Sequence, residues 1–128
     1  MQKNTLIIKN SEKKLEYAAK LLTQNQVVAI PTETVYGLAG RADNDKVIKK
    51  IYKIKNRPFS NPLIIHFKNI EDALQAIKAD NRANKIAAKF WPGPLTIVAK
   101  NRLNKISKLA TSNLGTIAIR VPSHPTIK

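Results

Sequence analysis

The sequence predicts a single α/β or α+β domain in which helices cover a sheet. Short apolar segments rich in β-branched residues alternate with segments whose apolar residues recur every three to four positions. They follow one another without long linkers, repeats or low-complexity stretches. Such interleaving is typical of a sheet with helices packed on it, and 128 residues suffice for one domain with one core.

The N-terminal part of the chain predicts a strand, a helix and a second strand. Residues 5–8 (TLII) form the first predicted strand. An apolar stripe over 15–22 predicts a helix, for which Ser11 is a possible N-cap. Residues 27–30 (VVAI) predict a short buried strand that ends at Pro31, because proline has no amide hydrogen to donate to a ladder.

The middle of the chain predicts a corner, a turn, a helix and a third strand. A polar corner over 31–34 (PTET) is followed by a turn from Gly37 to Gly40. Apolar residues at positions 47, 51 and 54 then predict an amphipathic helix that begins near Asn44. Residues 62–67 (PLIIHF) predict the third strand.

The last part of the chain predicts two helices and two strands. The helices are expected over 71–78 and 83–90, and Pro92 and Gly93 stop the second. The strands are expected over 95–99 and 116–121.

Composition and charge exclude several classes of protein. The chain has no cysteine and two histidines, which excludes disulfides, thiol catalysis and thiolate metal centres and leaves too few ligands for an ordinary zinc site. No apolar stretch approaches a membrane span and no signal-peptide pattern opens the chain, so a soluble protein in the cytoplasm is expected, with no membrane partner.

The net charge is strongly positive and uneven. Lys and Arg number 23 against 8 Asp and Glu, and every acid lies between Glu12 and Asp80. An anionic partner is therefore expected, either nucleic acid or a phosphorylated substrate. A biased codon composition is an equally good explanation, because lysine, isoleucine and asparagine are all abundant.

Two cations near the end of the predicted helix 44–54 are candidates for phosphate binding. A helical wheel places Lys55 on the apolar side of this helix, where a charge is unfavourable unless an anion meets it. In the alternative, the helix frays at Ile54 and the Lys55 side chain extends to water. Arg57 follows, just before Pro58, which disfavours helical geometry at Arg57.

Two strand residues are further candidates. In strand 62–67, His66 shares a face with Ile64; a lone histidine there is more often a hydrogen-bonded core residue than a ligand-binding one. In strand 116–121, alternation places Thr116 and Arg120 on one face with Ala118, whose small side chain leaves room beside the arginine. Arg120 suits either a ligand carboxylate or phosphate, or a structural pair with an acid.

Common catalytic patterns are absent. The sequence contains no Gly-rich phosphate-binding loop, dinucleotide fingerprint or nucleophile elbow. Glu33 is the only acid in the polar corner over 31–34. The sequence therefore offers few candidate groups for catalysis by a paired acid and base. Electrostatic positioning is the mechanism that these residues favour.

Four segments in order resemble the YrdC-like family of threonylcarbamoyl-AMP synthases. The segments are 31–38 (PTETVYGL), 55–63 (KNRPFSNPL), 90–96 (FWPGPLT) and 115–122 (GTIAIRVP). The resemblance implies one YrdC-like domain over 1–128, with a twisted mixed sheet covered by helices and a basic concave face. It also implies a nucleotidyltransferase that joins L-threonine, bicarbonate and ATP into threonylcarbamoyl-AMP and diphosphate.

The resemblance also assigns residues and partners. Thr34, His66 and Arg120 match positions that contact threonine, whereas Lys55, Arg57, Asn61 and Thr116 match positions around ATP, with Lys55 and Arg57 as the catalytic cations. No protein metal site is implied, and magnesium is expected to arrive on ATP. The product feeds N6-threonylcarbamoyladenosine formation at position 37 of tRNA, so threonylcarbamoyl-transfer machinery and tRNA or double-stranded RNA are expected partners.

The family pattern continues past the end of this sequence. After His124 and Pro125, family members run on to a Ser-x-Asn element that contacts ATP and threonine, whereas this chain stops at Lys128. The domain is therefore expected to be incomplete at its C-terminus, with activity lost or dependent on a partner chain. A non-catalytic RNA-binding module and an inactive remnant are the alternative functions.

Overall fold

The computed structural model describes residues 6–9 and 11–124. Its elements, in chain order, are α1 (Glu12–Thr23), β1 (Val28–Ile30), β2 (Gly37–Ala39), α2 (Asp45–Lys55), β3 (Ile64–His66), α3 (Ile70–Gln75), α4 (Asn81–Phe90), β4 (Ile97–Lys100) and β5 (Thr116–Arg120). In the described ranges, no helix is both long enough and apolar enough to cross a membrane.

The helices begin where the sequence offers side-chain caps. Ser11 accepts a hydrogen bond from the Lys14 amide, and Asn44 accepts one from the Val47 amide. These contacts satisfy amide groups that a helix start leaves without a partner. The predicted caps at Ser11 and Asn44 are therefore confirmed.

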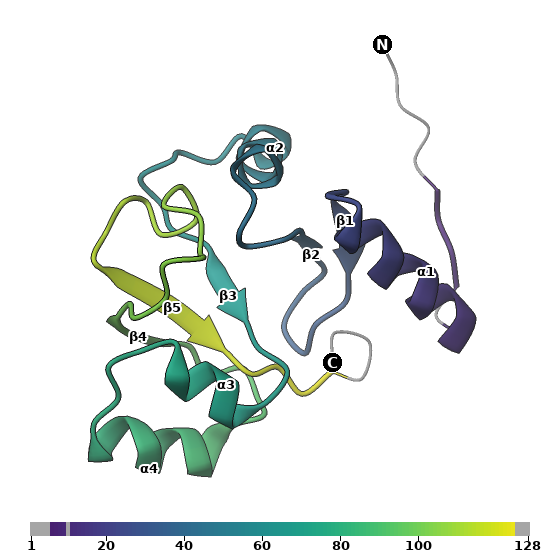
Figure 1. Ribbon diagram of the computed structural model, residues 1–128. Helices are drawn as coiled ribbons and strands as arrows, with labels where there is room; N and C mark the ends of the chain where they lie inside the picture. Colours follow the sequence, from purple (N-terminus) through teal and green to yellow (C-terminus); the bar gives the residue numbers. More distant parts are fainter. Residues whose placement is uncertain (1–5, 10, 125–128) are drawn as a thin grey trace.

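The strands form two sheets. β1 and β2 are an antiparallel hairpin, whereas β3, β5 and β4 form a mixed sheet with β5 in the centre. β5 pairs parallel with β3, placing His66 opposite Arg120, and antiparallel with β4. In Figure 1 the hairpin and α1 lie to one side of the mixed sheet, and α3 and α4 lie together below it.

One face of the mixed sheet belongs to the core. Ile117 and Ile119 of β5 are buried on this face, together with Ile65 of β3. They join a cluster with residues of α2, α3 and α4, including Tyr52 and Ala73. The opposite face of β3 and β5 carries Ile64, His66, Thr116, Ala118 and Arg120, as the alternation predicted.

Three expectations about local structure are wrong. Residues 6–8 of the predicted first strand form no strand; Thr5 lies outside the described residues. The predicted turn after the 31–34 corner is instead β2 itself, because residues 37–39 pair with β1. Ile54 was expected on the apolar stripe of α2, yet 55% of it is exposed, because α2 packs through a face centred on Ile48, Ile51 and Tyr52.

Candidate functional site: a cationic pocket between the two sheets

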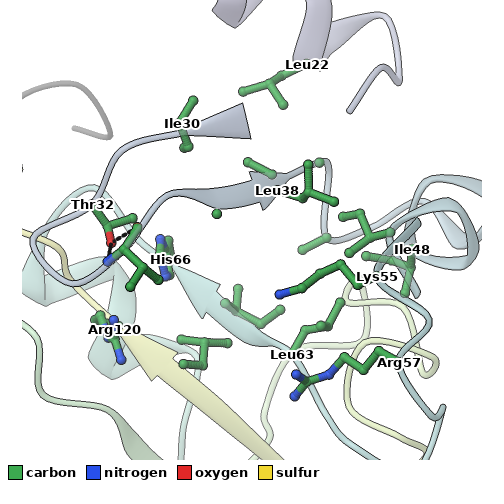
Figure 2. A pocket seen from close by; sticks show the side chains of 18 of the residues that line it. Leu22, Ile30, Thr32, Leu38, Ile48, Lys55, Arg57, Leu63, His66 and Arg120 are labelled. Atoms are coloured by element: carbon green, nitrogen blue, oxygen red, sulfur yellow. Dashed lines mark hydrogen bonds between the residues drawn. The ribbon is translucent and has the colours of Figure 1, made fainter. Parts of the chain in front are cut away.

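A pocket of about 520 Å³ lies between the hairpin and the mixed sheet. We call it the central pocket; its walls come from the hairpin and α1 (Leu22, Ile30, Thr32, Thr34, Val35, Gly37, Leu38, Ala39), from the start and inner face of α2 (Gly40, Ala42, Ile48, Ile51, Lys55, Arg57), and from β3 and β5 (Leu63, Ile64, Ile65, His66, Arg120). Its volume lies in the range of small-molecule sites. Figure 2 shows the hairpin above it and the strand residues below.

Lys55 reaches into the central pocket from the end of α2. It follows Ile48 and Ile51 on the same helix face, so it continues the buried stripe beyond the core. The helix extends through Lys55 and is capped by Asn56 in the left-handed conformation. The frayed-helix alternative is therefore wrong, although the side chain remains exposed to water. Figure 2 shows Lys55 pointing toward the middle of the pocket.

Arg57 lines the central pocket and also holds the loop that follows α2. Its Nε donates to the carbonyl oxygen of Asn61 at 3.2 Å, and its Nη2 donates to that of Pro62 at 2.8 Å. Because a guanidinium has five N–H donors, these two bonds leave part of the fork for other acceptors. Arg57 therefore combines a loop-bracing role with a place in the pocket wall.

Arg120 lies on the central strand and is oriented by Thr96. Its Nε and Nη2 donate to Thr96 Oγ1 at 3.1 and 2.8 Å. In the described part of the chain, the ion pairs are Arg41–Asp43 and Arg82–Asp80, so Arg120 makes no direct ion pair with an acid, although its charge acts on Glu33. The Arg120 side chain lines the central pocket.

The hairpin turn is organised by the Thr32 hydroxyl. Thr32 Oγ1 donates to the Val35 carbonyl oxygen at 2.6 Å and accepts from the amides of Thr34 and Val35. Thr32 Oγ1 also lies 2.9 Å from Thr34 Oγ1. Either hydroxyl can be the donor in this pair.

His66 stands between opposite charges at the strand wall. Loss of water contacts lowers the pKa of His66 from 6.5, the charge of Arg120 lowers it further, and the charge of Glu33 opposes both. The imidazole is therefore neutral near pH 7. His66 keeps part of its surface open at the pocket wall and loses water contacts over the rest, so it is not a fully buried core histidine.

Glu33 ties the hairpin to the segment after β5. Its Oε1 accepts from the Ser123 amide at 3.3 Å, while its buried Oε2 has no hydrogen-bond partner. Burial would raise the pKa of Glu33, but hydrogen bonds from the amides of Glu33, Ser123 and His124, together with the charge of Arg120, outweigh it and lower the pKa below 4.5. Glu33 is therefore ionised at neutral pH.

The structure brings five of the seven expected site residues together: Thr34, Lys55, Arg57, His66 and Arg120 all line the central pocket. Asn61 and Thr116 do not line it. Asn61 contributes its carbonyl oxygen to Arg57 and Tyr52, and Thr116 pairs with Lys100 at the far end of β5.

Thr32 and Thr96 are not among the site residues expected from the sequence. Both lie inside the quoted segments 31–38 and 90–96, so the signal was present, but their role is to orient Thr34 and Arg120 rather than to carry charge. In the described residues, no group of three or more His, Asp or Glu side chains is placed to hold a metal ion.

The fold and the pocket define an α/β domain with a cationic site walled by two sheets. The chain belongs to the Sua5/YciO/YrdC family, described as "Telomere recombination", whose sequence profile matches residues 20–128.

Relatives of known name and structure agree with this membership. The threonylcarbamoyl-AMP synthase of Bacillus subtilis is 41% identical over 119 residues, which cover 92% of this chain and 34% of the relative. The crystal structure of Pyrococcus abyssi Sua5 complexed with L-threonine is 38% identical, with a TM-score of 0.85 over 93% of this chain and 35% of that one. Escherichia coli YciO shares the fold, with a TM-score of 0.81 at 19% identity over 92% of this chain and 57% of that one. The chain thus spans about a third of the length of the first two.

Proposed function

We propose that the central pocket is the site at which L-threonine, bicarbonate and ATP are converted to threonylcarbamoyl-AMP and diphosphate. The observation that carries the proposal is that Thr34, Lys55, Arg57, His66 and Arg120 line one pocket. Relatives named threonylcarbamoyl-AMP synthase support the reaction, and the threonine complex of the Pyrococcus abyssi protein supports the amino acid.

The reaction needs positive charge more than a protein nucleophile. The threonine nitrogen attacks the carbon of bicarbonate, and loss of water leaves a carbamate. A carbamate oxygen then attacks the α-phosphorus of ATP, and the bond from that phosphorus to the diphosphate oxygen breaks. Negative charge increases on the phosphoryl and diphosphate oxygens, and nearby cations stabilise it.

The pocket divides these tasks between its two ends. In this proposal Arg120, which Thr96 orients, binds the threonine carboxylate, and Thr34 and the neutral His66 complete this end. Lys55 and Arg57, which line the pocket near the end of α2, bind the phosphates. ATP enters as its magnesium complex, and Asn61 and Thr116 remain the proposed further contacts to ATP.

Release of diphosphate tests the proposal. Purified chain with ATP, magnesium, L-threonine and bicarbonate is expected to release diphosphate, and to stop when either threonine or bicarbonate is omitted. Threonylcarbamoyl-AMP in the reaction mixture, measured by mass spectrometry, identifies the product. Release of diphosphate without threonine, or failure of the chain to bind both threonine and ATP in calorimetry, would contradict the assignment.

A further inference from the structure

A second hollow lies along α2 and the loop that follows this helix. It has a volume of about 370 Å³ and is lined by Lys49, Tyr52, Lys53, Asn56, Arg57 and Phe59. We call it the α2 groove. It shares only Arg57 with the central pocket.

The α2 groove has cations that no acid neutralises. Lys49 and Lys53 are one helical turn apart, so their side chains lie on the same face. Both are exposed, and neither takes part in the two ion pairs of the described residues. Lys46 lies one turn before Lys49 on the same side, so the positive charge forms a row rather than a single point.

The groove also has an aromatic platform that is held in place. Phe59 is 52% exposed, although its ring packs on Tyr52 with centroids 4.7 Å apart. Tyr52 is 1% exposed, and its hydroxyl hydrogen is shared between the carbonyl oxygens of Asn61 at 2.7 Å and Leu109 at 3.2 Å. Arg57 braces the same loop through Asn61 and Pro62. The Phe59 ring is therefore supported from beneath and open to solvent.

We propose that the α2 groove binds single-stranded nucleic acid, with backbone phosphates on Lys49 and Lys53 and an unstacked base on Phe59. A row of lysines suits successive phosphates, and an exposed aromatic ring offers a face to any base. A duplex is a poorer fit, since its bases stack on one another and leave no face for Phe59. This binding is separate from the proposed reaction, because the reacting groups lie in the central pocket.

Fluorescence polarisation with a labelled ten-nucleotide oligouridylate tests the proposal on the intact chain. The double variant Lys49→Ala/Lys53→Ala is expected to weaken binding and to lower the slope of log K against log salt by about 1.4, which corresponds to two phosphate contacts on a single strand. Phe59→Leu keeps an apolar contact on Tyr52 but removes the ring, so affinity is expected to fall at least about fivefold with the salt slope unchanged.

Helix α4 supplies a matched control. Lys85 and Lys89 have the same spacing on an exposed helix, beside the half-exposed Phe90, but they line neither the α2 groove nor the central pocket. Lys85→Ala/Lys89→Ala removes the same charge and is expected to change oligouridylate affinity by less than the groove variant. The groove variants are expected to retain diphosphate release at the wild-type rate.

Three results would overturn the proposal: equal losses for the α2 and α4 variants, unchanged affinity in both Phe59→Leu and Phe59→Ala, or displacement of the oligonucleotide by AMP at equal nucleotide concentration. Equal losses would indicate binding by net charge alone, and displacement by AMP would indicate a free nucleotide as the ligand. Circular dichroism and thermal melts confirm that each variant is folded.

Discussion

Arg57 illustrates how one side chain serves both the fold and the site. Two of its N–H groups hold the carbonyl oxygens of Asn61 and Pro62, which fixes the path of the loop that leads into β3. The same guanidinium lines the central pocket beside Lys55. Removing it therefore takes away a charge that we propose binds phosphate, together with two loop contacts.

Substitution of Arg57 separates these two roles. Arg57→Ala is expected to lower the rate of diphosphate release by roughly 10²–10³-fold, the loss typical of one transition-state donor, and to lower the free energy of unfolding by about 1 kcal/mol through the lost loop bonds. Arg57→Lys retains the charge but cannot span both carbonyls. It is expected to lose the same loop stability while retaining more activity than alanine.

Urea titrations and initial rates measure the two effects. Arg102→Ala, which removes an exposed cation outside both hollows, is the control for net charge. A wild-type rate in Arg57→Ala would show that Arg57 does not bind the reacting phosphates.

His66 reports the electrostatic balance of the strand wall. Its pKa lies below 6.5 because of burial and Arg120, with Glu33 acting in the opposite direction. The folded chain therefore takes up this proton at lower pH than the unfolded chain does. Between pH 6.5 and the lower folded pKa, stability decreases as pH falls, because the unfolded state is protonated first.

Proton NMR of the imidazole measures this balance directly. Arg120→Gln is expected to raise the His66 titration midpoint because it removes a repelling charge, whereas Glu33→Gln is expected to lower it because it removes an attracting one. The sequence has two histidines, so the spectrum of His66→Asn assigns the signals. Arg82→Gln should leave the midpoint unchanged; shifts of the same sign in the first two variants would refute the arrangement.

At the scale of elements, the approach of β2 to α2 depends on Gly40. A Cβ atom at this position would overlap Cγ1 of Val47 and lie 3.3 Å from Cδ1 of Ile51. Both residues belong to the buried face of α2, and a β-branched side chain in a helix has little rotamer freedom. The close packing that forms one end of the central pocket therefore requires glycine here.

Gly40→Ala tests this packing. The substitution is expected to lower the free energy of unfolding by about 1–3 kcal/mol, the usual range for overpacking. Gly37→Ala is the matched control, because a Cβ at Gly37 meets no atom within 4 Å. In urea denaturation, the second substitution Val47→Ala should relieve part of the clash in Gly40→Ala; equal stability of the two glycine variants would exclude this account.

Local patterns predicted the helices better than the hairpin. The caps at Ser11 and Asn44 are read from neighbouring residues, and the structure uses both. The strand β2 escaped prediction because Gly37–Ala39 is short, contains glycine and becomes a strand only by pairing with Val28–Ile30. Residues 6–8 have a strand-like composition but no partner strand among the described residues, which is why composition alone was misleading there.

At the scale of the whole molecule, the buried core and the hairpin are separate. The core cluster joins the mixed sheet with α2, α3 and α4, whereas α1 contains no buried residue and the hairpin residues are at most partly buried. The central pocket lies between these parts. A ligand in the pocket would therefore contact both the well-packed and the less packed side.

Hydrogen exchange is expected to reveal this difference. Amides of β1 and β2 should exchange faster than those of β5, because little apolar surface is buried around them. Addition of L-threonine and magnesium ATP should slow exchange in 28–39 more than in α4, which lies outside the pocket. Slowing confined to α4, or spread evenly over the chain, would argue against ligand binding between the sheets.

The site could be predicted in part because the periodicity of a helix or strand fixes the side on which each side chain lies. The wheel placed Lys55 inward, and alternation placed His66 and Arg120 on faces that pairing of β3 with β5 brings together. Periodicity carries no information on which distant segment covers that face. The hairpin wall, the Thr96 contact and the position of Thr116 at the other end of β5 therefore required the structure.

The two walls of the central pocket carry groups of different kinds. The hairpin side offers the neutral hydroxyls of Thr32 and Thr34, whereas the strand side offers the Arg120 guanidinium. Under the proposed function, a zwitterion is therefore expected to lie with its carboxylate on Arg120 and its ammonium group turned away from that cation.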